Sequence, residues 1–335
     1  MTSSHSTPAP ALLCVGEALI DMVPRQTPEG QAFLPLPGGA VFNTAIAAAR
    51  LGLPTWFWYG LSTDMFGDRL RGALAAAGVD ASLCRPADRP STLAFVTLVA
   101  GQARYLFLDE NTAGRMLTPA DIPAVPAEVG ALFLGGISLV VEPVGTTIEA
   151  MATAFAGDGR GRLIMLDPNV RPGFIRDEAA YRARIRRLIG LSHIVKLSDE
   201  DLGWLIGAGG LADQARTVLA MGPRLVLVTL GGRGAHAFTA TFDGHVAAPA
   251  VAVADTVGAG DTFNAGFLAA LAEQGALDPA AVAGLGSEAL LAALAFAVRA
   301  AAVSVTRVGA DPPWRHELAG EPGSQAPAAS STGTS

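Results

Sequence analysis

The chain has 335 residues and a formal net charge of −7, with 50% hydrophobic and only 16% charged residues. This length suits a large α/β domain or a pair of domains with a substantial core. The acidic balance and the lack of a dense basic block disfavour nucleic-acid binding, and no run of 18 uninterrupted apolar residues suggests a membrane span.

The two ends of the chain differ in composition from its interior. The first ten residues contain neither the basic region nor the apolar region of a signal peptide. The last residues are rich in Gly, Ser, Pro and Ala. We expect residues 1–10 and 319–335 to be disordered tails. Cys14 and Cys84 lie in apolar stretches without metal-ligand spacing, so reduced thiols and a cytoplasmic protein are expected.

The first predicted element is a buried strand at Leu12–Gly16, where the sequence is a short apolar run. Asp21 follows this strand. At the carboxyl edge of an open α/β sheet, where ligands bind, its carboxylate can hold two neighbouring hydroxyl groups. An exposed loop acid explains the residue equally well.

A glycine pair and an asparagine begin the next segment, PGGAVFNTAIAAARLG. Gly38 and Gly39 permit close approach of the backbone to a ligand. Asn43 lies in the first turn of a predicted alanine-rich helix that ends at Gly52. Because Asn is a mediocre residue inside a helix, its amide is a candidate for hydrogen bonding to a polyol.

Two alternating segments, Ser91–Val99 and Arg104–Asp109, predict a β-hairpin. Together with the weakly alternating Gln31–Pro37, the hairpin would form a small sheet projecting from the main domain. An ordinary edge hairpin of a central sheet is the alternative.

From Ala131 onward, apolar strand candidates alternate with helical stretches. The strands read ALFLGG, RLIMLDPN, HIVKLSDEDL and RLVLVTLGGRG. This is the pattern of a parallel sheet covered on both faces. Polar residues follow the strand ends, among them Arg171 and Lys196, the only lysine in a chain with 22 arginines.

The most informative stretch is VADTVGAGDTFNAGFL at Val253–Leu268. A glycine turn, Gly258–Gly260, leads into apolar residues at helical spacing, so its backbone N–H groups face an incoming ligand at the positive end of a helix. Such a turn binds phosphate or another anion. Asp261 would repel a resident anion but suits a transient one, beside which it accepts a proton; a favourable first-turn acid is the plainer interpretation.

Two motifs carry a resemblance to a known family. DTVGAGDTFNAGF resembles the second signature of the ribokinase-like (phosphofructokinase-B) sugar kinases, and PGGAVFNTAIAAARLG, through Gly60 and Gly67, resembles the first. No GxxxxGK[ST] phosphate loop occurs in the sequence. The resemblance implies a three-layer α/β/α sandwich with a mostly parallel sheet, one domain at 11–318, and a small β lid from about 22–37 and 90–112.

The resemblance also implies roles for individual residues. Asp261 would be the catalytic base. The turn of Gly258, Ala259 and Gly260 would form the anion hole, with the N–H groups of Ala259, Gly260 and Asp261 as its donors. The sugar-binding candidates are Asp21, Gly38, Gly39, Asn43, Arg104, Phe107 and Arg171. The ATP-binding candidates are Lys196, Ser198, Thr229, Gly231, Gly234 and Thr256.

Two cation sites follow from the same resemblance. Magnesium is assigned to Glu200 and Asp201, although Ser198 and Asp201 replace the Asn-x-x-Glu pair of many family members. A potassium ion next to the anion hole is assigned to a set from two segments: Asp255, Val257, Ser304, Arg307 and Gly309.

The segments GEALIDM, ARYLFLDENTAGRML and DPNVRPGFI look most like bacterial fructokinases. An ATP-dependent fructokinase that forms a homodimer through its lid is therefore predicted. The alternatives are a 2-keto-3-deoxygluconate kinase, a ribokinase and, more distantly, an adenosine kinase. A Rossmann oxidoreductase lacks its GxGxxG fingerprint here, and a catalytically inactive sugar sensor is disfavoured by the presence of Asp261.

Overall fold

An eight-stranded sheet forms the centre of the computed structural model, which describes residues 10–99 and 102–319, the side chains of 96–105 excepted. Its strand order is β14-β13-β12-β11-β10-β9-β1-β4. The strands are β1 (Ala11–Val15), β4 (Thr55–Trp58), β9 (Val129–Gly135), β10 (Leu163–Asp167), β11 (Ile194–Ser198), β12 (Leu225–Thr229), β13 (Ala235–Phe238) and β14 (Asp243–Val246). All neighbours from β4 to β12 pair in parallel.

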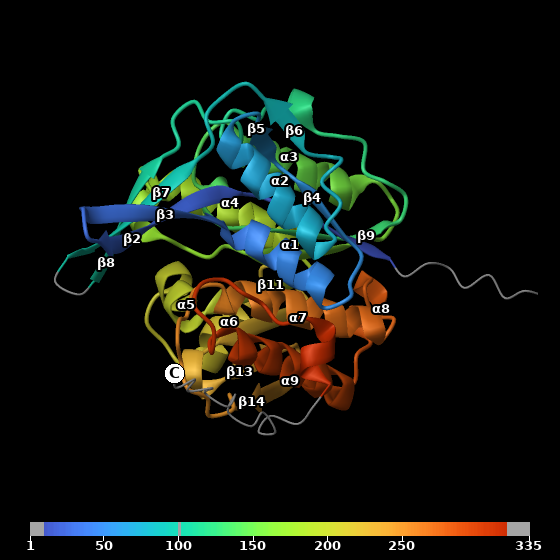
Figure 1. Ribbon diagram of the computed structural model, residues 1–335. Coiled ribbons are helices and arrows are strands. Elements are labelled where there is room, and N and C mark those ends of the chain that lie inside the picture. Colours follow the sequence, from blue (N-terminus) through green and yellow to red (C-terminus); the bar gives the residue numbers. More distant parts are fainter. Residues whose placement is uncertain (1–9, 100–101, 320–335) are drawn as a thin grey trace, which may run out of the picture.

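Helices cover both faces of this sheet (Figure 1). One group, whose members contact one another in sequence, contains α2 (Met65–Ala77), α1 (Ala40–Arg50), α7 (Ala259–Glu273) and α9 (Ser287–Ser304). The other contains α3 (Val144–Gly157), α4 (Glu178–Leu191), α5 (Asp199–Ile206) and α6 (Leu211–Leu219). A short helix, α8 (Pro279–Ala283), follows α7.

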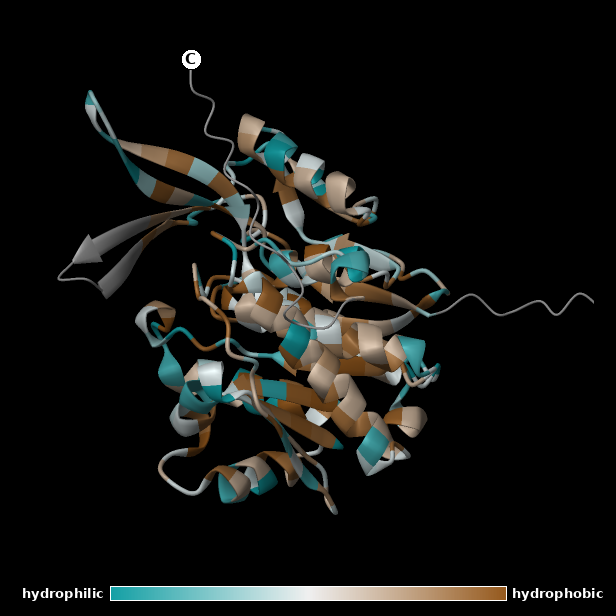
Figure 2. Ribbon diagram, turned by 60° about the horizontal axis from the view of Figure 1, so that its bottom comes forward, coloured by the Kyte–Doolittle hydropathy of each residue, from teal (hydrophilic) through white to brown (hydrophobic). Residues whose placement is uncertain are grey.

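The central strands are apolar because both of their faces are covered. Every residue of β1 and β10 is buried, and the hydrophobic strands lie inside the helical layers in Figure 2. The predicted three-layer α/β/α fold is confirmed. The antiparallel strands β13 and β14 extend one edge of the sheet, an addition that the sequence pattern does not predict.

A second, four-stranded sheet projects from the main body (Figure 1). Its order is β3-β2-β7-β8, built from β2 (Leu19–Thr27), β3 (Gly30–Gly38), β7 (Leu93–Val99) and β8 (Gln102–Leu108). The two hairpins join through the parallel pair β2–β7. These are the segments that the sequence suggests as a lid; residues 100–101, at the tip of the second hairpin, lie outside the described residues.

Short elements complete the described chain. Strands β5 (Gly60–Ser62) and β6 (Arg85–Ala87) pair in parallel. One-turn 3-10 helices lie at Pro119–Asp121, Ile137–Leu139, Pro172–Phe174, Gly231–Arg233 and Arg315–Leu318. The predicted tails, residues 1–10 and 319–335, fall almost wholly outside the described residues.

Helix α9 is long and apolar enough to cross a membrane by length and composition alone, the one such helix among the described residues. It packs along α7, and its inward side chains, Leu290, Leu294 and Ala297 among them, are buried. A helix of the protein core has these properties, so we assign α9 to the core of the domain.

Candidate active site

Most of the predicted site residues meet in one cavity of about 570 Å³. The cavity lies beyond the carboxyl ends of β1, β9, β10, β11 and β12, where an open α/β sheet binds its ligands. The predicted residues that line it are Asp21, Gly39, Asn43, Phe107, Arg171, Lys196, Ser198, Glu200, Asp201, Thr229, Gly231, Thr256, Val257, Gly258, Gly260 and Asp261.

The glycine turn begins α7 as the sequence predicts. Gly258 is the N-cap with φ of 77°, a left-handed conformation, and a Cβ added there would meet Ala310 at 2.8 Å. The N–H of Ala259 already donates to the Thr256 carbonyl at 3.3 Å. The N–H groups of Gly260 and Asp261 therefore remain as the donors that this helix end offers to an anion.

Asp261 is buried in the first turn of α7. Its Oδ2 accepts a hydrogen bond from Asn43 Nδ2 at 2.9 Å, which joins α7 to α1 across 218 positions of sequence. Burial raises the pKa of Asp261 to about 7, although the Asn43 hydrogen bond opposes this shift. A carboxyl group with that pKa is suited to accept a proton at neutral pH.

Lys196 lies beside the same helix end. A Cβ added to Gly260 would be 3.1 Å from Lys196 Nζ. The buried ammonium donates to Asp167 Oδ2 at 3.0 Å. Burial opposes its charge, but the carboxylates of Asp167, Asp201 and Asp261 outweigh burial and raise the pKa of Lys196. The side chain therefore stays positively charged next to the anion hole.

Asp167 connects α7 to the sheet. Its Oδ2 also accepts from Asn264 Nδ2 at 2.7 Å, and its Oδ1 accepts from the Asn169 N–H at 3.1 Å. Asn264 is fully buried one turn after Asp261, and its Oδ1 has no hydrogen-bond partner among the described residues. Asp167 thus fixes the position of Lys196, α7 and the loop after β10 together.

The opposite wall of the cavity belongs to the segments around β2, β3 and α1. A Cβ on Gly38 would lie 2.2 Å from Asp21 Oδ2, and one on Gly39, where φ is 114°, 2.6 Å from the Glu17 carbonyl. At position 39 the positive φ and the backbone carbonyl restrict the residue to glycine, whereas the atom that faces Gly38 is the end of the flexible Asp21 side chain. Burial raises the pKa of Asp21 to about 6. The carboxylate thus faces the cavity beside a backbone with no side chain to block a ligand.

Part of the small sheet also reaches the cavity. The Phe107 ring of β8 packs edge-on against Phe174 at 4.4 Å between centroids. Arg171, exposed at the mouth, donates to the Val170 carbonyl at 3.1 Å. Arg104 also lies in β8, but its side chain is outside the described residues.

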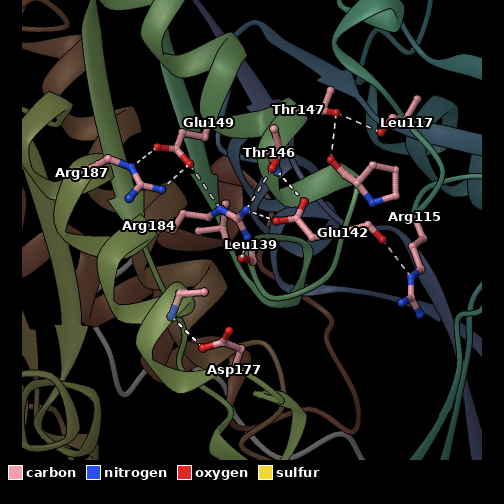
Figure 3. A network of polar contacts seen from close by, with 12 residues as sticks. Arg115, Leu117, Leu139, Glu142, Thr146, Thr147, Glu149, Asp177, Arg184 and Arg187 are labelled. Carbon is pink, nitrogen blue, oxygen red and sulfur yellow. Dashed lines mark hydrogen bonds and ion pairs between the residues drawn. The ribbon is translucent and has the colours of Figure 1, made fainter.

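A network of ion pairs supports the loop after β9, behind this wall (Figure 3). Arg184 donates to Glu142 and Thr146 and, at 2.9 Å, to the Leu139 carbonyl. Arg187 donates to Glu149. Leu139 ends the 3-10 turn that carries Ile137 along the cavity. This network therefore fixes that part of the cavity wall without contacting the glycine turn Gly258–Gly260.

A second, mostly apolar cavity of about 420 Å³ adjoins the first. Thr229, Gly231, Thr256 and Gly260 line both cavities. The remaining walls of the second are apolar or small: Gly232, Gly234, Ala235, Ala248, Pro249, Ala250, Val251, Val253, Ala259, Phe263, Val298, Ala301, Ala302 and Val305. The glycine turn therefore stands at the junction between a polar and an apolar compartment.

The predicted magnesium residues differ in their availability. Both oxygens of Asp201 already accept backbone N–H groups, Oδ1 from Val170 and Oδ2 from Ser198. Glu200 is exposed at the cavity. Among the described residues, no three His, Cys, Asp or Glu side chains gather to hold a metal ion. Mg²⁺ needs no such cage, because phosphate oxygens and waters supply most of its ligands in kinases.

The predicted potassium residues lie behind the turn, where the segments 254–258 and 304–311 meet. Asp255 Oδ2 accepts from the Gly309 N–H at 2.9 Å, and Oδ1 accepts from the Val257 N–H at 3.1 Å. The Ser304 hydroxyl is buried without a partner among the described residues. The Arg307 guanidinium pairs with Glu317, whereas the resemblance assigns the cation to backbone carbonyl groups of this segment.

Four residues of the site are missing from the sequence-based candidates. Glu17 is buried at the cavity and accepts from the N–H groups of Ala40 and Ser138, and the other three are Asp167, Asn169 and Asn264. All four lie inside or next to the motifs discussed above. Glu17, Asp167 and Asn169 lie at or just after strand ends, and Asn264 lies in the motif that begins α7. These positions were the available signal, but the pairings that give the four residues roles join distant segments.

Comparison with known proteins identifies the family. A family model described as pfkB family carbohydrate kinase matches residues 9–317. The chain belongs to the pfkB family of carbohydrate kinases. It is 49% identical over 280 residues to a fructokinase of Rhizobium leguminosarum bv. trifolii, which covers 83% of this chain and 85% of the relative.

Solved structures agree with this family. The fructokinase of Xylella fastidiosa with bound ATP superposes with a TM-score of 0.82 at 31% identity, covering 90% of this chain and 93% of the other. A double mutant of the Vibrio cholerae fructokinase, solved with fructose, ADP and a potassium ion, superposes with a TM-score of 0.79 at 26% identity. The match covers 90% of this chain and 94% of the other.

Proposed function

We propose that this pfkB-family kinase transfers the γ-phosphoryl group of ATP to a hydroxyl group of D-fructose. The single observation that carries the proposal is the location of Asp261. Its carboxyl group, with a pKa raised to about 7, lines the polar cavity directly after Gly260, which lines both cavities. The N–H groups of Gly260 and Asp261 at this helix N-terminus have no hydrogen-bond partner in the part of the chain that the structure describes. The assignment of fructose as the acceptor rests on the fructokinases among the relatives.

The nucleotide lies across the junction. The apolar cavity takes the adenine ring, because its Val, Ala and Pro walls offer burial without charge. The triphosphate then runs past Thr229, Gly231 and Thr256 toward the glycine turn. The N–H groups of Gly260 and Asp261 and the ammonium of Lys196 neutralise the charge on the transferred group.

The sugar lies in the polar cavity, held by Asp21, Asn43 and the backbone of Gly39. Its hydroxyl oxygen attacks the γ-phosphorus, the bond from that phosphorus to the β,γ-bridging oxygen breaks, and ADP leaves with the bonding electrons. Asp261 accepts the proton of the hydroxyl group, a role typically worth about 10²–10⁴-fold in rate. The burial that raises its pKa also keeps competing water away.

Two cations complete the proposed site. Mg²⁺ bound to the phosphates neutralises their negative charge, and Glu200 is the carboxylate available to it. Potassium would be held by the carbonyl groups of the segments around Asp255 and Ser304, with the orphaned Ser304 hydroxyl in support. The potassium ion in the Vibrio cholerae structure supports this assignment.

The small sheet is the proposed lid. Phe107 reaches the cavity from β8 and packs on Phe174, so movement of the sheet would open and close the sugar site. Leu34, Leu106 and Leu108 of this sheet are exposed. Such apolar side chains suit an interface between two copies of the chain, and we propose a homodimer of this kind in the cytoplasm.

The test is ADP release by the purified protein with ATP and Mg²⁺ across several acceptors: fructose, 2-keto-3-deoxygluconate, ribose, glucose and adenosine. We expect fructose to give a kcat/KM at least about tenfold above the others, which is the discrimination that about 1.4 kcal/mol provides. Faster turnover of another acceptor would support the kinase mechanism but contradict the assignment of fructose as the substrate. Absence of turnover with every acceptor would overturn the proposed function.

A further inference from the structure

A separate pocket of about 610 Å³ lies where the ends of α1 and α9 meet the 3-10 turn Arg315–Leu318. It is lined by Arg50, Arg299, Trp314, Arg315, His316, Leu318 and Ala319. None of these residues lines the two cavities at the strand ends. Three arginines and a histidine face this pocket without an acidic residue in its lining, in a chain whose net charge is −7.

Two of these arginines have carboxylate partners at the rim of the pocket. Arg50 pairs with Asp311 at 2.6 Å, and Arg315 pairs with Glu273 at 2.9 Å. Each ion pair uses only part of a guanidinium group, which has five N–H donors. Donors of both arginines therefore remain for a further oxygen ligand.

Arg299 has no such partner. Within residues 10–99 and 102–319 Arg299 makes no hydrogen bond or ion pair. It makes one cation–π contact, with its Cζ atom 5.5 Å from the centroid of the Phe296 ring. The Nε atoms of Arg299 and of Arg50 are both covered from solvent without an acceptor. A donor of a charged group that is covered from solvent and unpaired lowers the stability of the fold. A bound anion would therefore satisfy the half-buried Arg299 guanidinium.

We propose that this pocket binds a phosphate group, either as inorganic phosphate or as part of a small phosphate monoester. Arginine forks match the oxygens of a phosphate group in bidentate geometry. Arg299 supplies the unpaired charge, and Arg50 and Arg315 supply further donors. The Trp314 ring, under which the Arg50 guanidinium lies 5.1 Å from the centroid, gives a flat face for the rest of an ester.

The pocket shares no lining residue with the two cavities at the strand ends, but the backbone segment 309–312 connects it to the glycine turn. Arg50 also donates to the Pro312 carbonyl at 2.7 Å. The same segment carries Ala310, which contacts the Gly258 turn, and Gly309, which donates to Asp255. Filling the pocket therefore stabilises the segment that packs against the anion hole.

The experiment measures phosphate binding by calorimetry at constant ionic strength, with chloride as the reference anion. The wild-type chain is compared with R299Q and with R186Q, which removes an exposed arginine on α4 that also lacks a partner among the described residues. We expect a binding component that R186Q keeps and R299Q weakens at least about tenfold, the change that 1.4 kcal/mol produces. A component from the catalytic cleft would remain in all three chains.

Two further arms make the result decisive. R299K keeps the charge and should retain part of the affinity, whereas identical isotherms for the wild-type chain, R299Q and R186Q would overturn the proposal. If R299Q does not fold, R315Q replaces it under the same two outcomes. Inorganic phosphate, fructose 6-phosphate and AMP serve as separate probes. Tighter binding of inorganic phosphate than of both esters identifies free phosphate as the ligand, and tighter binding of one ester identifies a phosphate monoester.

Discussion

Two polar networks in this molecule both pair acidic with basic side chains but differ in their surroundings. The cleft network, defined here as Asn43, Asp167, Lys196, Asp261 and Asn264, is buried at the ends of the parallel strands. The wall network, defined as the ion pairs of Arg184 and Arg187 with Glu142 and Glu149 (Figure 3), lies partly in solvent, with the side chains of Glu142 and Arg187 both 56% exposed.

The two networks shift the pKa of their acids in opposite directions. Burial raises the pKa of Asp261 to about 7. In the wall network, the Arg187 hydrogen bond holds the pKa of Glu149 below its ordinary value, and hydrogen bonds from Arg184 and Thr146 outweigh burial to lower that of Glu142. The cleft therefore keeps a costly charge ready for chemistry, while the wall network makes charges favourable and stabilises the fold.

Removal of the proposed base, Asp261, gives the largest expected effect. Asp261→Asn should lower kcat by at least about 10²-fold, because the amide cannot accept the hydroxyl proton. The fold should persist, since an amide oxygen still accepts the Asn43 hydrogen bond. The measurement is ADP release with ATP, Mg²⁺ and fructose. Turnover within a few-fold of the wild-type rate would refute the role of Asp261 as base.

Removal of the cleft cation should affect both activity and stability. Lys196→Met takes away a charge beside the anion hole, and we expect kcat to fall by about 10²–10³-fold. It also leaves Asp167 buried without its ionic partner, which typically costs about 3–5 kcal/mol. Turnover and urea unfolding measure the two effects.

The double variant D167N/K196M is the matched control for this change. It removes both charges, so part of the lost stability should return while turnover stays low. If the double variant recovers activity along with stability, Lys196 acts only by supporting the fold.

The wall network should behave differently. Arg184→Met breaks its hydrogen bonds to Glu142, Thr146 and the Leu139 carbonyl, and we expect the free energy of unfolding to fall by about 2 kcal/mol. The turnover of the folded fraction should change less than about twofold. A selective loss of kcat, measured at full folding, would remove the distinction between the two networks.

An exposed ion pair should give the smallest change in the free energy of unfolding. Arg216 and Asp213 pair on α6 with both side chains mostly in solvent. Arg216→Gln should change the free energy of unfolding by less than about 0.5 kcal/mol and leave turnover unaltered. A loss as large as that of Arg184→Met would show that solvent exposure does not separate these pairs.

The sequence predicts well those features that short segments encode. Apolar runs such as the one at β10 and the glycine turn before α7 identify the strand–helix alternation and the anion-binding helix end, since both depend on neighbouring residues. The antiparallel β13–β14 edge depends on pairing between short strands of no distinct pattern. Its residues gave no local signal.

The connections within the cleft network could not be predicted for a related reason. The bond from Asn43 to Asp261 crosses 218 positions, and that from Asn264 to Asp167 crosses 97. Composition and spacing show which residues are suited to hydrogen bonding, but only the fold determines their partners. The same holds for Glu17, whose role rests on N–H groups from two distant turns.

The central claim is that burial holds the Asp261 carboxyl group at a pKa near neutrality. A carboxyl group whose pKa rises from 3.8 unfolded to about 7 folded adds a stability cost that is absent below pH 3.8, grows as pH rises to 7 and is constant above it. The direct measurement is the free energy of unfolding of the wild-type chain and of D261N from pH 5 to pH 8. We predict that D261N is the more stable at pH 8, by up to about 4 kcal/mol, and that its advantage shrinks as pH falls toward 5. A wild-type chain that gains stability over D261N as pH rises would contradict the account.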